Sequence, residues 1–339
     1  MSERLFSVDD VIESRAMRDQ GHPSALLGLR EPAYSTELGA MYEVDSLEAL
    51  RSMPTGSVNL VVTSPPYALE FKKAYGNADK AEYVEWLRPF GQEIHRVLAD
   101  DGSFVLNIGG SYVKGSPTRS LYHFRALLML CDEIGFHLAQ ECFWHNPAKL
   151  PAPAEWVNVR RMRIKDSVEY VWWLSKGPFP KANNRSVLVE YSADMRRLMR
   201  RGYKAKERPS GWNITEKFQT DQGGAIPSSM IEAGNNDSNS AYMARCKAAG
   251  VKPHPARFPA AIPDFFIRLL TETHDVVLDV FAGSNTAGRV AENHGRRWLG
   301  FERVAEYARA SAYRFEDAEL MACWDDPSDG DRLRRASAA

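Results

Sequence analysis

The sequence predicts an α/β protein built on a Rossmann-like, doubly wound mixed sheet that carries an inserted region. Apolar runs of strand length alternate with helical stretches from Ala40 to Leu174, the pattern expected when strands and helices interleave. A strand, a turn of small residues, a helix and another strand then follow between residues 276 and 302. A chain of 339 residues is long enough for one such core and a substantial insertion.

Five runs before the insertion are expected to form strands. They are AMYEV, VNLVVT, SFVLNI, FHLAQECFW and VEYVWWL, in chain order. The last run contains the pair Trp172 and Trp173, which we interpret as core residues rather than a platform for a ligand.

One helix is well marked between the second and third runs. Asp79 followed by Glu82 indicates a capping box at its start. Pro89 should kink or divide this helix, because proline removes a backbone donor. Asp101 and Gly102 predict a turn before SFVLNI.

Composition divides the chain into five parts. Between about residues 178 and 250 the turn-forming residues rise and the periodic runs fade, as in a loop-dominated insertion that contacts a ligand. The parts are an N-terminal extension (1–38), a first α/β half (39–177), the insertion (178–250), a second α/β half (251–315) and an acidic C-terminal tail (316–339). Disorder of the insertion is the alternative, but its apolar residues could form a small core: Trp212, Phe218, Ile226, Met230, Ile231 and Tyr242.

The composition indicates a soluble cytoplasmic protein. Hydrophobic residues make up 44% and charged residues 26%, and no apolar stretch reaches membrane-spanning length. The first residues lack the zones of a signal peptide, so we expect no membrane partner. Four scattered cysteines predict neither a disulfide framework nor a metal site.

Charge is segregated along the chain, although the net charge is only −1. One basic cluster comprises Arg160, Arg161, Arg163 and Lys165, and the stretch from Glu316 to Asp331 is acidic. A larger basic run comprises Arg196, Arg197, Arg200, Arg201, Lys204, Lys206 and Arg208. Such a run is either a solvated helix face or a polyanion site, and the aromatic and turn residues around it favour the polyanion site.

The loop Thr63-Ser64-Pro65-Pro66-Tyr67 has the chemistry of a nucleobase site. Two prolines end the strand before it and leave a stiff loop at the carboxyl edge of the sheet, where open α/β sheets hold ligands. Ser64 can accept a hydrogen bond from an exocyclic amine, the Pro65 carbonyl lacks a ladder partner, and Tyr67 offers an aromatic face. A buried core tyrosine is the alternative for Tyr67.

Residues 276–302 form a predicted nucleoside-binding unit. The small residues Ala282, Gly283 and Ser284 allow close approach to the backbone, and Glu302 can accept from ribose hydroxyls. Asn285 stands where the dinucleotide fingerprint would place a second glycine, so a pyrophosphate cofactor is disfavoured. A purely structural turn is the alternative.

Three motifs in this order resemble the amino-methyltransferases that act on DNA bases. They are TSPPY (63–67), KPHPARFP (252–259) and DVFAGSNTAG (279–288). The order is that of the permuted beta class, and the serine before Pro-Pro-Tyr resembles the cytosine-N4 branch. The resemblance spans about residues 40–310, leaving both termini outside it.

The resemblance implies a role for each matching residue. Ser64, Pro65, Pro66 and Tyr67 would be catalytic. The methyl donor S-adenosylmethionine, which becomes S-adenosylhomocysteine, would be bound without a metal by Asp45, His254, Pro255, Phe258, Asp279, Phe281, Ala282, Gly283, Ser284, Asn285 and Glu302. For Asp45 a helix N-cap is an equally open interpretation.

The same resemblance implies a reaction and partners. The enzyme would methylate N4 of a cytosine flipped out of duplex DNA, by direct in-line transfer without a covalent intermediate. Candidate DNA-binding residues are Lys72, Lys73, Arg196, Arg197, Arg200, Arg201 and Lys204, and a second aromatic wall for the base would come from Phe71, Tyr75 or Trp144.

Other interpretations of the same motifs remain open. The enzyme would be a monomer or homodimer at the nucleoid, either solitary or with a cognate restriction endonuclease. The alternatives are an adenine-N6 or RNA-base enzyme that uses the same loop, or a catalytically silent nucleic-acid-binding module.

Overall fold

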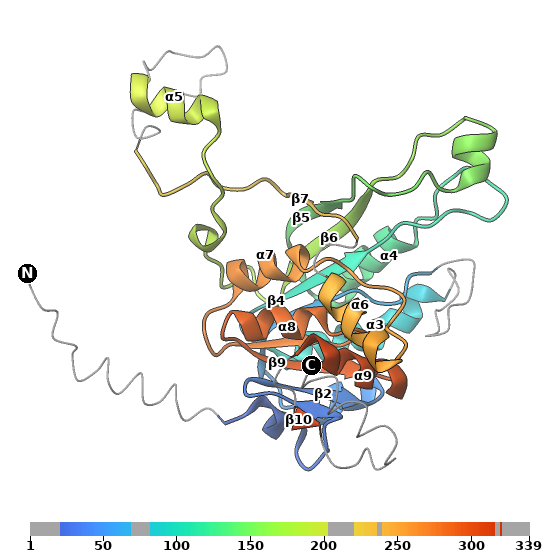
Figure 1. Cartoon of the computed structure of the whole chain (residues 1–339), viewed down its shortest axis with the longest axis vertical. Coiled ribbons are helices and arrows are strands. Elements are labelled where there is room, and N and C mark those ends of the chain that lie inside the picture. Colours follow the sequence, from blue (N-terminus) through green and yellow to red (C-terminus); the bar gives the residue numbers. More distant parts are fainter. Residues whose placement is uncertain (1–20, 69–81, 203–219, 236–238, 316–318, 321–339) are drawn as a thin grey trace, which may run out of the picture.

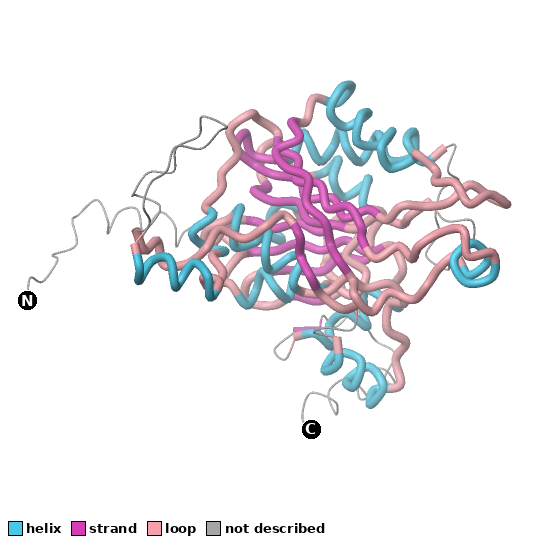
Figure 2. Tube along the Cα trace, turned by 90° about the horizontal axis from the view of Figure 1, so that it is seen from above, coloured by secondary structure: helices cyan, strands magenta, loops and turns pink. Residues whose placement is uncertain are grey.

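The computed structural model describes residues 21–68, 82–202, 220–235, 239–315 and 319–320. Its centre is a ten-stranded mixed sheet in the order β10-β1-β2-β9-β8-β3-β4-β6-β5-β7. Figure 2 shows this sheet between helices that cover both of its faces. The predicted doubly wound α/β class is therefore confirmed.

The strands follow the apolar runs of the sequence closely. Their bounds are β1 Tyr34–Ser35, β2 Gly39–Glu43, β3 Val58–Thr63, β4 Leu98–Ile108, β5 His137–His145, β6 Val168–Ser175, β7 Met230–Glu232, β8 Val276–Asp279, β9 Arg297–Glu302 and β10 Glu319–Leu320. The central strands β2, β9, β8, β3 and β4 are parallel, while β6 pairs antiparallel with β4 and β5.

Helices pack on the two faces in separate sets. Their bounds are η1 Pro23–Leu27, α2 Ser46–Ser52, α3 Tyr83–Val97, α4 Tyr122–Leu128, η2 Met129–Ile134, η3 Glu155–Val159, η4 Asn184–Val187, α5 Ala193–Arg201, α6 Ser240–Ala249, α7 Ala261–Leu270, α8 Thr286–Asn293, α9 Ala305–Ser311 and η6 Ala312–Arg314. Buried residues of α2, α3 and α4 join one core cluster, and those of α7, α8 and α9 join another on the opposite face. This burial pattern makes the fold a three-layer sandwich.

Parallel pairing brings the two predicted motifs to one edge of the sheet. Strand β3 pairs in parallel with β8, and β8 pairs in parallel with β9. The loop that follows Thr63, the turn that follows Asp279 and the residues around Glu302 therefore lie at the carboxyl ends of neighbouring strands. Open α/β sheets bind their ligands at this edge.

Several local expectations differ from the structure. Helix α3 continues across Pro89, because proline removes the donor for one carbonyl, that of Glu85, while the buried face of the helix holds the remaining turns against the sheet. Its N-cap residue Glu82 makes no capping hydrogen bond, and Asp79 lies outside the described residues. Asp101 and Gly102 lie within the long strand β4, where the pairing register with β3 shifts, and not in a separate turn.

Within the described part of the insertion, the predicted residues form no separate core. Ile231 lies on β7 and joins the core cluster of α7, α8 and α9, because β7 adds to the edge of the sheet beside β5. Tyr242 joins a small cluster with Tyr313, whereas Ile226 and Met230 are exposed. The other two members, Trp212 and Phe218, lie outside the described residues.

Two segments project from the sheet. Helix α5 lies at the end of extended connections in the insertion, and none of its side chains is buried (Figure 1). The connection between β5 and β6, residues 146–167, extends on the other side and carries η3. No helix in the described ranges has the length and apolarity to cross a bilayer.

Candidate active site

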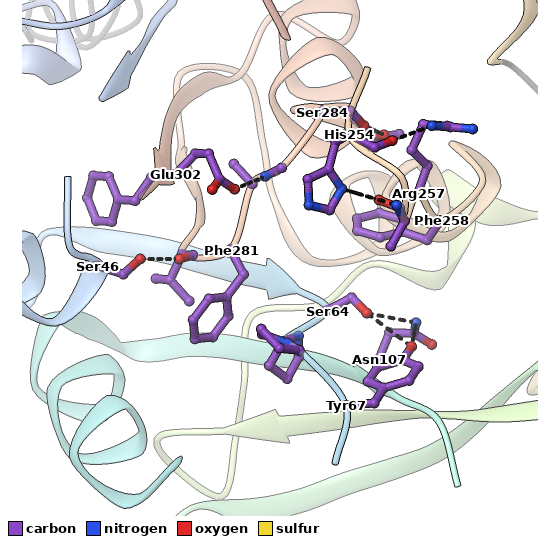
Figure 3. A pocket seen from close by; sticks show the side chains of 18 of the residues that line it. Ser46, Ser64, Tyr67, Asn107, His254, Arg257, Phe258, Phe281, Ser284 and Glu302 are labelled. Atoms are coloured by element: carbon purple, nitrogen blue, oxygen red, sulfur yellow. Dashed lines mark hydrogen bonds between the residues drawn. The ribbon is translucent and has the colours of Figure 1, made fainter. Parts of the chain in front are cut away.

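One cavity of about 920 Å³ opens at the carboxyl edge of the sheet. The Ser64–Tyr67 loop, the Phe281–Ser284 turn and the segment 254–258 all contribute to its wall (Figure 3). The two motifs that lie far apart in the sequence therefore share one site.

The Ser64–Tyr67 loop is fixed by hydrogen bonds among its own side chains and those of adjacent strands. Ser64 Oγ lies 3.1 Å from Tyr67 Oη, and Asn107 Nδ2 donates to Tyr67 Oη at 2.8 Å and to Ser64 Oγ at 3.3 Å. Tyr67 in turn donates to Glu169 Oε2 at 2.9 Å, and Glu169 Oε1 pairs with Lys149 Nζ at 2.9 Å. These contacts hold the serine oxygen and the phenol ring in a single arrangement.

Burial and charge keep the Tyr67 phenol protonated. Burial raises the pKa of Tyr67 well above its ordinary value of 10, and the neighbouring Glu169 carboxylate raises it further. Its ring packs against Gly109, where an added Cβ would lie 2.5 Å from a ring carbon. A side chain at position 109 would displace the ring, so Gly109 is part of the loop's support.

The glycine turn is built around Gly283, whose φ of +51° lies in the left-handed region. A Cβ at this position would lie 3.0 Å from Nδ1 of His254, so the imidazole packs directly on the backbone. His254 Nδ1 also lies 2.6 Å from the Ala256 carbonyl oxygen. Burial lowers the pKa of His254, which favours the neutral ring.

Glu302 closes the turn from strand β9. Its Oε2 accepts from the Gly283 amide at 3.1 Å and its Oε1 accepts from the Val304 amide at 2.8 Å. Burial raises the pKa of Glu302, while these two amides lower it. The carboxylate lines the cavity and retains lone pairs for further donors.

The buried side chain of Arg314 supports the Phe281–Ser284 turn through hydrogen bonds to Ser284. Arg314 Nη2 donates to Ser284 Oγ at 2.8 Å and to Asn239 Oδ1 at 2.7 Å, and its Nε donates to the Ser284 carbonyl. The guanidinium also lies 4.3 Å from the ring centroid of Tyr242. No sequence pattern marks this arginine, because it lies far beyond the motif and outside any periodic run.

Aromatic side chains form the remaining walls. Phe281 stacks on Trp86 with ring centroids 5.7 Å apart and contacts Phe90 at 5.1 Å. Trp144 lines the cavity, and its indole donates to the Ala233 carbonyl at 2.9 Å. Of the three aromatic candidates for a second wall, Phe71 and Tyr75 lie outside the described residues.

Most predicted cofactor residues line the cavity. They are Asp45, His254, Pro255, Phe258, Phe281, Ala282, Gly283, Ser284 and Glu302. Asp45 is also the N-cap of α2, where its Oδ1 accepts from the Leu47 and Glu48 amides. The next residue, Ser46, donates to the Val280 carbonyl at 2.5 Å and so connects α2 to the glycine turn.

Two predicted cofactor residues lie behind the wall and do not line it. Asp279 is fully buried, and its Oδ1 accepts from Thr63 Oγ1 at 2.5 Å and from the Phe281 amide at 3.1 Å. Asn285 caps α8 through the Gly288 amide and donates to Tyr34 Oη at 2.9 Å. Both side chains shape the turn, and their predicted contact with a ligand stays a prediction.

The predicted DNA-binding residues divide between described and undescribed segments. Arg196, Arg197, Arg200 and Arg201 lie on the exposed helix α5. Arg196 and Arg197 pair with Glu190 and Asp194 in exposed ion pairs. Lys72, Lys73 and Lys204 lie outside the described residues.

Comparison with known proteins assigns the class of protein that this fold and site define. A family model described as DNA methylase matches residues 58–313, and the chain belongs to that family.

Individual relatives agree with this assignment. The chain is 50% identical over 294 residues to the type II methyltransferase M.PvuII of Proteus hauseri, across 86% of this chain and 88% of that protein. The solved structure of the PvuII DNA methyltransferase (cytosine-N4-specific) matches with a TM-score of 0.71 and 44% identity, covering 91% of this chain and 96% of that one. TTHA0409 of Thermus thermophilus, solved with S-adenosyl-L-methionine, shares the fold at 23% identity and a TM-score of 0.50, with 81% and 91% of the chains covered.

The buried Asp279 carboxyl predicts a pH-dependent stability. Burial raises its pKa from 3.8 to about 7, so the folded protein binds a proton that the unfolded chain releases. The free energy of unfolding should therefore fall as pH rises from about 4 to about 7, by a few kcal/mol at about 1.4 kcal/mol per pKa unit.

Asp279→Asn should remove this slope, because the amide keeps the acceptor for Thr63 and does not ionise. Urea unfolding at several pH values measures the effect in both proteins. Parallel stability curves for the wild type and the variant would show that the carboxyl does not titrate in this window.

Proposed function

We propose that this protein is a site-specific DNA methyltransferase that transfers a methyl group from S-adenosylmethionine to the exocyclic N4 of cytosine. The observation that supports it best is the shared cavity of the Ser64–Tyr67 loop and the Gly283 turn. The solved PvuII DNA methyltransferase, which matches 91% of this chain, is named as cytosine-N4-specific.

The loop residues would act by positioning and polarising the amino group. The Ser64 hydroxyl oxygen and the Pro65 carbonyl accept hydrogen bonds from the amine and direct its electron density toward the methyl carbon. None of the cysteines in the described ranges, Cys131, Cys142 and Cys246, lines the cavity. We therefore propose direct in-line transfer without a covalent enzyme intermediate.

The residues of the glycine turn fit S-adenosylmethionine by their chemistry. The Glu302 carboxylate provides an acceptor for ribose hydroxyls, and Gly283 leaves the backbone open to close approach. We propose that the methionine end of the cofactor is surrounded by His254, Pro255, Phe258, Ala282 and Ser284. Phe281 would lie beside the ribose and Asp45 near the adenine. When bound, the cofactor supplies the activated methyl group.

Double-stranded DNA would lie across the carboxyl edge, with the target base flipped into the cavity at a cost of a few kcal/mol. Stacking on an aromatic ring such as Tyr67 offsets about 1–3 kcal/mol of that cost. Helix α5 and the projecting segment 146–167, which carries Arg160 and Arg161, provide cations on two sides. A cognate restriction endonuclease is the protein partner that we propose, because the relatives bear type II names.

The proposed function is tested by incubating the protein with labelled S-adenosylmethionine and duplex DNA and then digesting the DNA to nucleosides. The expected product is N4-methylcytosine, and Ser64→Ala should reduce its formation by about 100-fold or more. Label in N6-methyladenine would assign the adenine reaction instead. Absence of any transfer by wild-type protein with undiminished DNA binding would indicate a silent binding module.

Gly283→Asp should weaken S-adenosylmethionine binding by at least about tenfold. The new side chain meets the His254 ring and brings a second carboxylate close to Glu302. Isothermal titration calorimetry measures the change. Gly28→Asp is the matched control, because Gly28 has a φ of +63° and open space around it outside the cavity. Equal affinities for the two variants would remove the turn from the cofactor site.

Changing Arg196, Arg197, Arg200 and Arg201 to Gln should weaken DNA binding and flatten its dependence on salt. Each lost phosphate contact lowers the slope of log K against log salt by about 0.9. Fluorescence anisotropy from about 50 to 200 mM salt measures this slope. The double variant Arg51→Gln, Arg125→Gln, on helices α2 and α4, controls for the change in net charge. If it lowers DNA affinity and the salt slope by as much per removed charge, the DNA surface lies away from α5.

A further inference from the structure

A hydrogen-bonded chain leads from the catalytic serine to a carboxylate that the sequence motifs do not include. The links are Ser64 Oγ to Tyr67 Oη at 3.1 Å and Tyr67 Oη to Glu169 Oε2 at 2.9 Å. Glu169 lies on β6 and lines the same cavity, with 16% of its side chain exposed.

The direction of the protons along this chain follows from the available donors. An ionised carboxylate only accepts, so the single proton of Tyr67 points to Glu169. Tyr67 Oη must then accept from its other neighbours, which orients the Asn107 amide with Nδ2 toward it. The same requirement directs the Ser64 proton toward Tyr67.

This arrangement leaves Ser64 Oγ as an acceptor toward the cavity. Its proton is directed to Tyr67 and one lone pair faces Asn107 Nδ2, so the second lone pair is available for a bound amine. Methylation of an amine requires such an acceptor, because the nitrogen must lose a proton once it has bonded to the methyl carbon.

We propose that Glu169 is the terminal proton acceptor of the methyl transfer, reached through Ser64 and Tyr67. As the nitrogen bonds to the methyl carbon, the carbon–sulfur bond breaks with its electron pair going to sulfur. Ser64 Oγ takes the proton from the nitrogen, passes its own proton to Tyr67, and Tyr67 passes its proton to Glu169. The products are methylated base, thioether and a neutral Glu169 carboxyl, which returns its proton to solvent. The inference rests on the proposed function.

The groups around Glu169 suit this role. In the described part of the chain its charged and titratable neighbours are Lys149 after β5, Tyr67 after β3 and Tyr122 on α4. Lys149 Nζ donates to the carboxylate at 2.9 Å and so holds it beside Tyr67. The high pKa of Tyr67 means that the phenol passes a proton on rather than storing a negative charge. Lys149 and Asn107 are thus positioning residues for the relay.

Glu169→Gln and Tyr67→Phe test the relay in single-turnover methylation of duplex DNA at saturating S-adenosylmethionine. Each should lower the rate by about 100-fold, and the double variant should be no slower than either single variant, because both interrupt one path. Multiplying effects in the double variant would overturn the relay, as would a Glu169→Gln rate within about threefold of wild type.

Matched variants separate the relay from a merely structural role. Glu232→Gln alters a carboxylate that pairs with His145 outside the relay and should keep the wild-type rate. Lys149→Met should lower the single-turnover rate by about tenfold, since the carboxylate loses the donor that holds it beside Tyr67. A wild-type rate in Lys149→Met would contradict its role in positioning the relay.

Two readouts do not depend on turnover. The infrared difference spectrum of the ligand-free protein, wild type minus Glu169→Gln, should show a carboxylate band. This band should change frequency in Lys149→Met, because the carboxylate loses a hydrogen-bond donor. Calorimetry with S-adenosylmethionine should give wild-type affinity for Glu169→Gln, which excludes misfolding. If wild-type protein forms no methylated cytosine, the proposed function fails; if it does and Glu169→Gln does so equally fast, only the relay fails.

Discussion

The hydrogen bond between Thr63 and Asp279 is the constraint on which the site depends. It joins the ends of two neighbouring parallel strands at 2.5 Å, and each residue also holds the Phe281 amide. The diproline loop and the glycine turn diverge immediately after these residues. Their separation across the cavity is therefore set by a buried contact that no ligand needs to touch.

Much of the architecture can be predicted because it depends on local patterns. The strands at 58–63 and 168–175 coincide with their apolar runs, and small residues after a buried strand predict the strand–turn–helix unit around Gly283. Ser64 and Glu302 can also be predicted as cavity residues, because each occupies a fixed position in a local sequence motif. Their roles toward ligands stay predictions.

What the sequence cannot supply is determined by tertiary packing. Glu169 lies in the strand VEYVWWL, where one acid in an apolar run gives no sign of a partner 102 residues away. Arg314 reaches the Ser284 turn from beyond the motif. The motif positions of Asp279 and Asn285 predict cavity residues, yet the pleat and the helix cap direct both side chains inward.

The pairing of β1 with β10 has a consequence for chain connectivity. Ser35 and Glu319 are direct partners across this antiparallel pair, so segments from opposite ends of the sequence meet at one edge of the sheet. A short peptide linker that joins these two segments, with new chain termini placed between the two α/β halves, would leave every strand neighbour unchanged. The sheet thus imposes no particular order of synthesis on its two halves, and a circularly rearranged gene could encode the same cavity.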